Sequence, residues 1–285
     1  MTTICICGAG TMGSGIAQVS ASAGFRTLLF DVSEAAVQHA AKKLESDLAR
    51  LVEKEKIVQQ KAEETLGNTV FVSDLQQCKA DLVIEAVVEK LDVKISLFQQ
   101  LAAINSRKTI FASNTSSLSI TQIAKELPCP EQVAGLHFFN PAPLMKLVEV
   151  VKGEKTADDV IAQLVAFTKA VGKVPVVCKD SPGFIVNRVA RPYYIESLRL
   201  AEEGTSYDVV DRLLEAAGFK MGPFKLMDLI GNDVNYAVSC SVYEQLGKPE
   251  RLQPSYIQKE KVEKGELGKK TGKGYYGPLS PGGGT

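Results

Sequence analysis

The chain has 285 residues, enough for one large or two medium domains, and 45% of them are apolar, which is sufficient for a substantial core. Lysine plus arginine and aspartate plus glutamate each number 33, so the net charge is zero, and neither a nucleic-acid partner nor a membrane-binding polybasic tract is expected. No apolar run reaches the roughly 18 residues of a membrane-spanning helix. The six cysteines form no CxxC pair, so no metal site is expected. Four or five of them lie in or beside apolar runs and are interpreted as buried thiols in a reducing cytoplasm.

The first segment combines a strand, a glycine-rich turn and a helix. The apolar run 3–7 predicts a strand that begins too near Met1 to leave room for a signal peptide. Residues 8–13 read GAGTMG, 14–23 predict a helix, and a second strand over 26–30 ends at Asp31. A lone GxGxxG is weak evidence. Between a strand and a helix, with an acid 18 residues after its last glycine, it is the full dinucleotide fingerprint.

Each position of this fingerprint has a chemical reason. Gly8 permits the tight turn, Gly10 lets backbone N–H groups reach a pyrophosphate, and Gly13 allows close helix–strand packing. The helix N-terminus adds positive potential at the phosphates. Asp31 is expected to bind the adenosine ribose and repel a 2′-phosphate, which favours NAD over NADP. The alternative is a chance glycine turn. The predicted cofactor contacts in this segment are Gly8, Gly10, Thr11, Met12, Gly13 and Asp31.

Apolar side chains at helical spacing over 34–60 predict a helix whose opposite face is charged. The ordinary interpretation of such a face is solvation. A sharper hypothesis assigns Arg50 and Lys54, four residues apart on one face, to an anionic ligand. Residues 61–79 are expected to form a polar connector with one short strand at 70–72.

Two further predicted strands, 81–87 and 109–112, carry polar residues at their carboxyl ends, where open α/β sheets bind ligands. Glu89 and Lys94 follow the first of them. The second is followed by a hydroxyl-rich run at 113–117, which often only caps the next helix. Its position nevertheless indicates a ligand contact. Glu89, Lys94 and Asn114 are therefore predicted cofactor contacts, and the serines are predicted substrate contacts.

The chain has two histidines, and His137 is the one that ends an apolar run of strand type, 133–137. A second run, 145–151, places Glu149 on an apolar face, where a carboxylate needs a partner. If this run folds back at the turn 140–143, position 137 falls opposite position 149. Glu149 would then hold one imidazole nitrogen and leave the other as an acid/base. A structural pair in the core is the alternative.

Near residue 180 the pattern changes from alternating strands and helices to helices alone. A helix over 158–170 and a strand over 174–177 close the first half, and a new helix is expected to start at Ser181, with Asn187 in its first turns. Further helices are predicted over 207–217, 231–246 and 254–264.

This organisation predicts an α/β chain. We expect a Rossmann-type, doubly wound, mostly parallel sheet with a helical hairpin insertion over 1–180, an all-α domain over 181–280 and a flexible tail over 281–285. The helical half is richer in apolar residues than its size requires, which favours a homodimer. Those residues include Tyr193, Tyr194, Val234, Tyr236, Val238 and Val242.

With these motifs in place, the sequence resembles the L-3-hydroxyacyl-CoA dehydrogenases over roughly residues 3–277, most closely the short bacterial 3-hydroxybutyryl-CoA and phenylacetate-pathway members. The motifs are GAGTMGSGIA at 8–17, DLVIEAVVE at 81–89, SNTSSLSI at 113–120, GLHFFNPAPLMKLVEVV at 135–151, DSPGFIVNR at 180–188 and LGKKTGKGYY at 267–276.

The resemblance implies NAD-dependent oxidation of a short-chain L-3-hydroxyacyl-CoA to the 3-oxoacyl-CoA, and the reverse, within cytoplasmic fatty-acid β-oxidation or phenylacetate degradation. It implies His137 as the base, Glu149 as its orienting carboxylate, and Ser116 and Asn187 as contacts of the substrate oxygen. Arg50 and Lys54 would then meet the coenzyme A phosphates. Two alternatives remain: a dehydrogenase of a sugar acid such as L-gulonate, and a recruited non-enzymatic NAD-binding protein.

Overall fold

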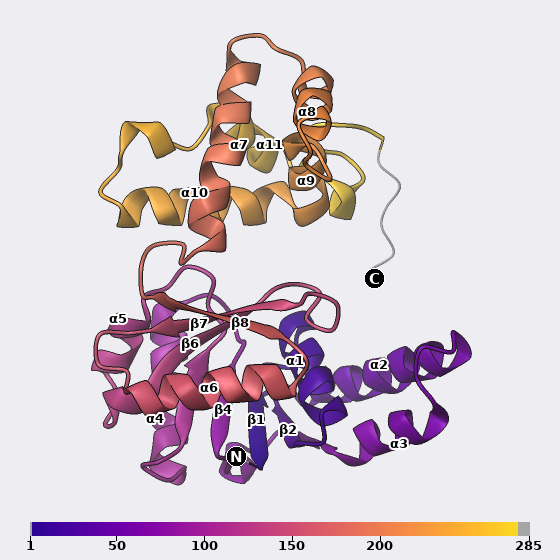
Figure 1. The fold of residues 1–285 in the computed structure, drawn as a ribbon, viewed down its shortest axis with the longest axis vertical. Coiled ribbons are helices and arrows are strands. Elements are labelled where there is room, and N and C mark those ends of the chain that lie inside the picture. Colours follow the sequence, from indigo (N-terminus) through magenta and orange to yellow (C-terminus); the bar gives the residue numbers. More distant parts are fainter. Residues whose placement is uncertain (1, 279–285) are drawn as a thin grey trace. The chain divides into compact units, whose positions relative to one another are not determined.

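The computed structural model describes residues 2–278, whose chain path is shown in Figure 1. The chain divides into two compact units, Met1–Ser181 and Pro182–Thr285, and each has its own hydrophobic core. The tail expected over 281–285 lies outside the described residues. No helix within 2–278 is long and apolar enough to cross a membrane.

Within the described residues, the first unit is built on one sheet of eight strands. They are β1 (Thr3–Cys7), β2 (Arg26–Phe30), β3 (Thr69–Val72), β4 (Leu82–Glu85), β5 (Ile110–Ser113), β6 (Val133–Phe138), β7 (Leu147–Lys152) and β8 (Val174–Lys179). Their order is β3-β2-β1-β4-β5-β6-β7-β8, and neighbours are parallel except for the antiparallel pair β6 and β7. This confirms the predicted Rossmann-type, mostly parallel sheet.

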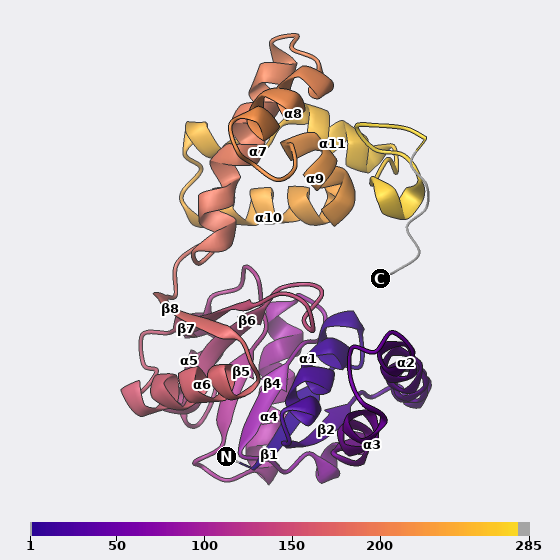
Figure 2. The same cartoon turned by 45° about the vertical axis from the view of Figure 1, so that its right-hand side comes forward.

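Helices flank the sheet of the first unit (Figures 1 and 2). They are α1 (Thr11–Ser22), α2 (Glu34–Glu53), α3 (Gln59–Gly67), α4 (Leu91–Ile104), α5 (Ile120–Lys125) and α6 (Asp158–Ala170), with the short 3-10 helices η1 (Leu75–Gln77) and η2 (Pro130–Gln132). Side chains alternate across each strand. In β5, Ile110 and Ala112 join the core under α1 and α6, whereas Phe111 packs its ring on Phe98 of α4 at 5.5 Å. Both faces are therefore covered, which is why the central strands are continuously apolar.

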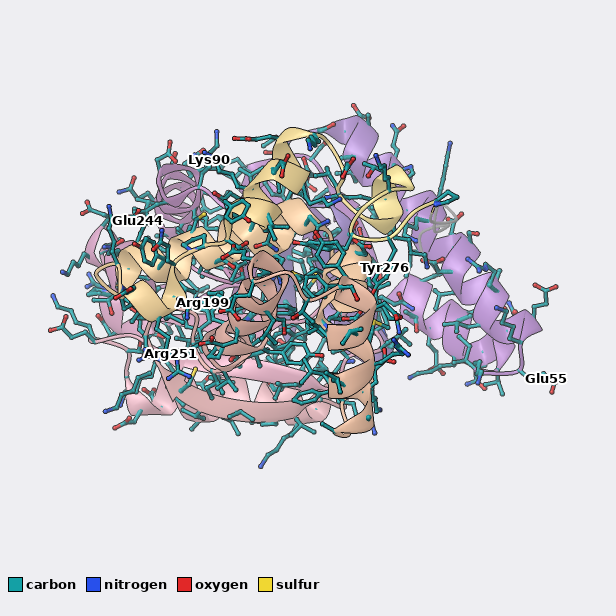
Figure 3. All side chains as sticks on the ribbon, turned by 90° about the horizontal axis from the view of Figure 1, so that it is seen from above. Glu55, Lys90, Arg199, Glu244, Arg251 and Tyr276 are labelled. Atoms are coloured by element: carbon teal, nitrogen blue, oxygen red, sulfur yellow. The ribbon has the colours of Figure 1, made fainter. Side chains whose placement is uncertain are left out.

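The helical hairpin α2–α3 is present, but the predicted boundaries within it were wrong. The helix expected over 34–60 ends at Glu53, and the connector expected from residue 61 contains α3. Glu55, at the tip of the hairpin in Figure 3, has a φ of 54°, and this left-handed turn reverses the chain. Apolar side chains on both helices then pack against each other. One long helix and two packed helices share this apolar spacing, so periodicity alone did not separate them.

The second unit is helical within the described residues. Its helices are α7 (Val186–Glu202), α8 (Tyr207–Ala216), α9 (Pro223–Ile230), α10 (Asn232–Gln245) and α11 (Tyr256–Glu263), with the 3-10 helices η3 (Glu250–Leu252) and η4 (Lys269–Thr271). The sequence did not predict α9. The helix expected to start at Ser181 begins instead at Val186, because Gly183 and Phe184 have φ values of 74° and 49° and turn the chain first.

Asp180, just before the expected helix start at Ser181, has a structural role that the sequence did not indicate. Its carboxylate accepts hydrogen bonds from the Ser119 hydroxyl at 2.8 Å and from the backbone N–H groups of Ile120 and Thr121 at 3.1 and 2.7 Å. These donors belong to the first turn of α5 and the residue before it, where N–H groups have no intrahelical partner. Asp180 therefore caps α5.

The C-terminal motif at 267–276 is anchored by two buried carboxylates. Asp228 accepts from the backbone N–H groups of Tyr275 and Tyr276 at 2.9 and 3.0 Å, and Asp211 accepts from the Tyr276 hydroxyl at 2.8 Å. A Cβ on Gly274 would lie 1.8 Å from an Asp228 oxygen, so this position requires glycine. The motif is thus explained by packing within the second unit.

Candidate active site

The glycine-rich loop after β1 has the shape of a phosphate cradle. Gly8 has a φ of 106°, and a Cβ there would lie 2.6 Å from the Ala86 carbonyl oxygen. A Cβ on Gly13 would lie 1.7 Å from the Gly8 carbonyl oxygen, so α1 approaches the loop backbone itself. A Cβ on Gly10 would have no atom within 4 Å, and no side chain caps the N-terminus of α1. An open helix N-terminus of this kind fits a pyrophosphate.

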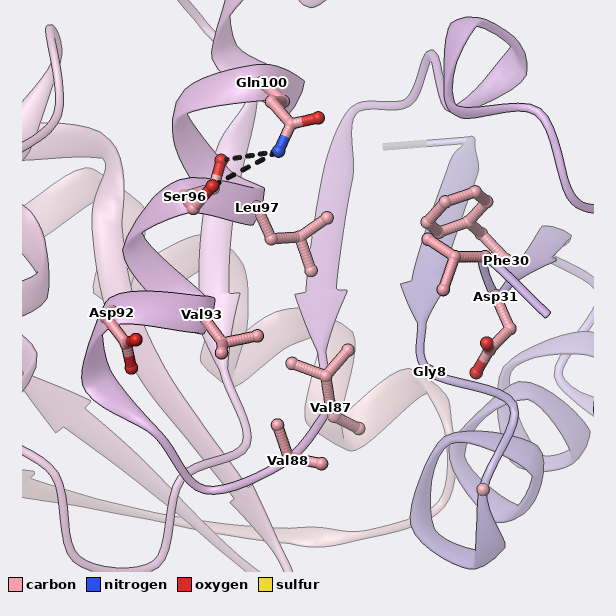
Figure 4. Close-up of a pocket in the computed structure, with 13 residues that line it drawn as sticks. Gly8, Phe30, Asp31, Val87, Val88, Asp92, Val93, Ser96, Leu97 and Gln100 are labelled. Carbon is pink, nitrogen blue, oxygen red and sulfur yellow. Dashed lines mark hydrogen bonds between the residues drawn. The ribbon is translucent and has the colours of Figure 1, made fainter.

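A pocket of about 760 Å³ lies beside this loop, between the ends of β1 and β2 and the start of α4 (Figure 4). One wall is apolar and is formed by Val87, Val88, Val93 and Leu97, and Asp31 lies at the other wall. Asp92, at the start of α4, is a second carboxylate in the lining. An apolar slot with a carboxylate at one wall fits an adenosine, whose base is flat and whose ribose carries hydroxyl donors.

Asp31 also supports the loop, a role that the sequence did not indicate. One carboxylate oxygen accepts from the Ala9 N–H at 2.9 Å, and the other accepts from the Ser33 N–H at 2.9 Å. The carboxylate therefore ties the glycine-rich loop to the end of β2 from within the pocket.

A buried charge cluster joins the ends of β4 and β5. The Lys94 ammonium lies 2.6 Å from Glu85 Oε1 and 3.1 Å from Glu89 Oε2. Lys94 is 1% exposed and Glu85 is fully buried. Burial raises the pKa of the Glu85 carboxyl, against the opposing effect of Lys94. Burial alone would also raise the pKa of Glu89. The charge of Lys94 and the hydrogen bonds to the Glu89 carboxylate outweigh this effect, so the pKa of Glu89 is lowered.

Glu89 holds the serine loop that follows β5. Its Oε1 accepts from the Thr115 hydroxyl at 2.5 Å and from the N–H groups of Ser116 and Ser117 at 2.9 and 3.2 Å. Lys94, predicted as a cofactor contact, is buried beneath Glu89 and fixes that carboxylate in place. Glu85 was not predicted from the sequence as a member of this cluster, although an acid in a strand buried on both faces was the available signal.

His137 and Glu149 face each other across the antiparallel pair β6 and β7, in the register that the sequence predicted. His137 Nδ1 lies 2.7 Å from Glu149 Oε2. The two residues are 6% and 1% exposed, and the ring of Phe139 lies 4.4 Å from the imidazole. Because Nδ1 is engaged with a carboxylate, the tautomer is set with the proton on Nδ1 and Nε2 as the basic nitrogen.

The turn between these strands is braced from three sides. Lys173 is buried and donates to the Pro143 carbonyl at 3.0 Å, and burial lowers the pKa of this lysine. Asn114, predicted as a cofactor contact, accepts from the Phe138 N–H at 2.8 Å. A Cβ on Gly15 of α1 would lie 3.1 Å from the Ala142 Cβ, so the helix packs closely on the turn. Lys173 gave no signal in the sequence.

Apart from the glycine-rich loop, Asp31 and Lys94, which are described above, the predicted site residues fall into three groups. The groups on β5, β6, β7 and the β4–α4 loop converge at neighbouring strand ends. Arg50 and Lys54 lie at the exposed end of α2, and Arg50 is 61% exposed and 3.9 Å from Asp47. Asn187 lies in the second unit at the start of α7, where its carbonyl accepts from Arg191 at 3.0 Å. The group of converging side chains is Glu89, Asn114, Ser116, His137 and Glu149.

Comparison with known proteins gives matches along almost the whole chain. Residues 3–181 match the family described as 3-hydroxyacyl-CoA dehydrogenase, NAD binding domain, and residues 183–277 match 3-hydroxyacyl-CoA dehydrogenase, C-terminal domain. The chain is 50% identical over 277 residues to the 3-hydroxyadipyl-CoA dehydrogenase of Escherichia coli K12, covering 96% of this chain but 58% of that protein. The chain therefore spans less than two thirds of the length of this relative.

Two other relatives are matched over nearly their whole length. The mitochondrial hydroxyacyl-coenzyme A dehydrogenase of Sus scrofa is 42% identical over 282 residues, which cover 96% of this chain and 90% of that protein. The crystal structure of (S)-3-hydroxybutyryl-CoA dehydrogenase PaaH1 from Ralstonia eutropha has a TM-score of 0.93 at 38% identity, covering 97% of this chain and 98% of that one.

The position of Asp31 in the pocket leads to a prediction about cofactor choice. We expect NADH to bind much more tightly than NADPH, because the carboxylate repels a 2′-phosphate. Asp31→Asn removes the charge but keeps one acceptor oxygen, which can still accept from the Ala9 N–H, so it should narrow the ratio of the two dissociation constants by about tenfold. Asp31→Ala should weaken NADH binding further, because it also removes the partner of the Ala9 N–H.

Titration of both cofactors measures these ratios. Asp159→Asn, which neutralises an exposed carboxylate on α6, is the matched control and should change neither affinity. Equal affinities for NADH and NADPH in the unmodified protein would contradict the role given to Asp31.

Proposed function

Because the chain belongs to the 3-hydroxyacyl-CoA dehydrogenase family, we propose that it interconverts a short-chain L-3-hydroxyacyl-CoA and the corresponding 3-oxoacyl-CoA. The family match confirms the family, the dehydrogenase class and the NAD cofactor predicted from the sequence. The buried pair of His137 and Glu149 at the end of β6 is the observation that carries the proposal. The short chain is supported by the names of two relatives, which specify 3-hydroxyadipyl-CoA and 3-hydroxybutyryl-CoA.

The chemistry divides between the cofactor and the protein. Bound NAD supplies the hydride acceptor. His137 removes the proton of the 3-hydroxyl group through Nε2, and Glu149 holds the tautomer and stabilises the imidazolium that forms. Ser116, fixed by its N–H bond to Glu89, and Asn187 steady the substrate oxygen in this proposal. General acid–base assistance of this kind is typically worth about 10² to 10⁴ in rate.

The proposal is tested by substituting the dyad. With acetoacetyl-CoA and NADH, His137→Ala should lower kcat by about 10² to 10⁴, and Glu149→Gln should lower it severely as well. If the two residues act as one unit, the double variant should be little slower than the slower single variant. Steady-state kinetics give kcat, and NADH titration is the control, because the loop and Asp31 are untouched.

Two results would count against this role. If the losses simply multiplied, or if His137→Ala kept most of its kcat, the dyad would be a structural pair and the base would have to be sought elsewhere. If the protein without substitutions binds NADH but reduces no substrate, that result would favour the non-enzymatic alternative.

Arg50 and Lys54 are proposed to meet the coenzyme A phosphates from the end of α2. Changing both to Ala should raise KM for acetoacetyl-CoA several-fold and leave KM for NADH and kcat nearly unchanged, because the contacts are remote from the reacting carbon. Lys42→Ala with Lys43→Ala removes the same charge from the same helix and serves as the control. An unchanged KM would leave these cations as solvated surface. Activity on free sugar acids but not on thioesters would favour the sugar-acid alternative.

We also propose a homodimer formed through the second unit. Tyr194 and Val242, which the sequence analysis counted toward the interface, are instead 5% and 0% exposed within the unit itself. The exposed apolar residues that support the proposal are Val189, Leu213, Phe219, Leu229, Val234 and Tyr256. Sedimentation at micromolar concentration should give twice the chain mass, and a monomer would refute the proposal. A cytoplasmic role in fatty-acid β-oxidation or phenylacetate degradation belongs to the same proposal.

A further inference from the structure

The cluster of Glu85, Lys94 and Glu89 contains two carboxylates and one ammonium group, and its hydrogen bonds fix its charge. Every partner of Glu85 donates to it. The Val87 N–H lies 2.7 Å from Oε1, and the Ser113 hydroxyl lies 2.7 Å from Oε2. Ser113 itself accepts from the Thr115 N–H, so its own proton points to Glu85. A carboxylate surrounded by donors is ionised.

The same argument holds for Glu89. The N–H groups of Ser116 and Ser117 can only donate, and the Thr115 hydroxyl accepts from the Leu118 N–H at 2.8 Å, which directs its proton to Glu89. The cluster therefore has a net charge of −1. Its inner part is buried, whereas the Glu89 side chain is 38% exposed at the edge of the sheet. The surrounding protein screens this negative charge only weakly, and the charge reaches solvent only at the Glu89 side.

The position of this charge relative to the cofactor follows from the strand order. The adenosine pocket lies beside β2 and the pyrophosphate cradle follows β1. The remaining half of a dinucleotide must then extend in the other direction, over β4 and β5, because the proposed base, His137, is on β6. That half is the nicotinamide, whose ring carries a positive charge when oxidised and none when reduced.

We propose that the Glu85–Lys94–Glu89 cluster discriminates between the two redox states of the cofactor, stabilising bound NAD⁺ relative to bound NADH. This rests on the proposed function, because it requires a nicotinamide at the end of β5. The role differs from a hydrogen bond to the cofactor, which both redox states would share. It also gives a purpose to Glu85, which is too deeply buried to touch any ligand.

The test compares dissociation constants for NAD⁺ and NADH, measured by titration at one ionic strength and pH 7. Glu89→Gln brings the cluster to neutrality, so the ratio of the NAD⁺ constant to the NADH constant should rise by about threefold to tenfold. Glu85→Gln should shift the ratio in the same direction without altering any group that a ligand can touch. Glu131→Gln removes an exposed charge of the same size at the opposite end of β6 and should leave the ratio unchanged.

The outcomes separate a charge effect from a structural one. If both affinities fall in proportion, Glu89 only holds the serine loop and the proposal is overturned. The proposal is also overturned if the ratio of the NAD⁺ constant to the NADH constant falls in Glu89→Gln. It is likewise overturned if Glu131→Gln changes that ratio by the same amount. If Glu85→Gln does not fold, the half-exposed Glu89 variant still decides the question. An unmodified protein that binds neither cofactor would instead remove the proposed function.

Discussion

The site depends on one constraint of a parallel sheet, which is that consecutive strands end at the same edge. Here β1, β4, β5 and β6 deliver the glycine-rich loop, Glu85, the serine loop and His137 to neighbouring positions. Polar groups crowded at a covered edge must bond to one another, since an unpartnered buried charge is costly. Lys94 pairs with both carboxylates. Glu89 in turn fixes the serine loop by accepting hydrogen bonds from the backbone N–H groups of that loop. The same contacts therefore stabilise the edge and position the site.

Much of this arrangement was predictable from local patterns. The strand–GxGxxG–helix–strand order with Asp31 identified the cofactor loop, and the structure shows that Gly8 and Gly13 leave no room for a Cβ. The pairing of His137 with Glu149 followed from two apolar runs, one turn and the period of a strand. Side-chain alternation made the acid on an apolar face visible, and one partner was available at the opposite register position.

What the sequence did not give depends on contacts between distant segments. Lys173 braces the turn between β6 and β7 from 30 residues away, and Asp180 caps a helix 60 residues earlier in the chain. Neither contact produces a periodic pattern in the sequence. The hairpin tip and the delayed start of α7 both involve left-handed backbone at a non-glycine residue, Glu55 and Phe184 respectively. The residue type does not predict this conformation. The spacing of Arg50 and Lys54 indicated only an anionic ligand, and their coenzyme A role, like the role of Asn187, came from the resemblance. All three roles are still proposals.

The proposed chemistry gives the two acidic groups complementary tasks. With NAD bound, oxidation of the substrate would leave the nicotinamide neutral and His137 protonated. One positive charge would thus be lost at the cofactor ring and gained at the imidazole. In the arrangement proposed here the Glu85–Lys94–Glu89 cluster is nearest the first location. Glu149, 2.7 Å from His137 Nδ1, is nearest the second. A site with Glu149 alone would favour the product state, and a site with the cluster alone would favour the starting state. With both present, the electrostatic difference between the two ends of the reaction is reduced, which suits a reaction that runs in either direction. The cluster is built at the ends of β4 and β5, whereas Glu149 belongs to β7, beyond β6 in the strand order. Each is therefore proposed to act on its own location of the charge.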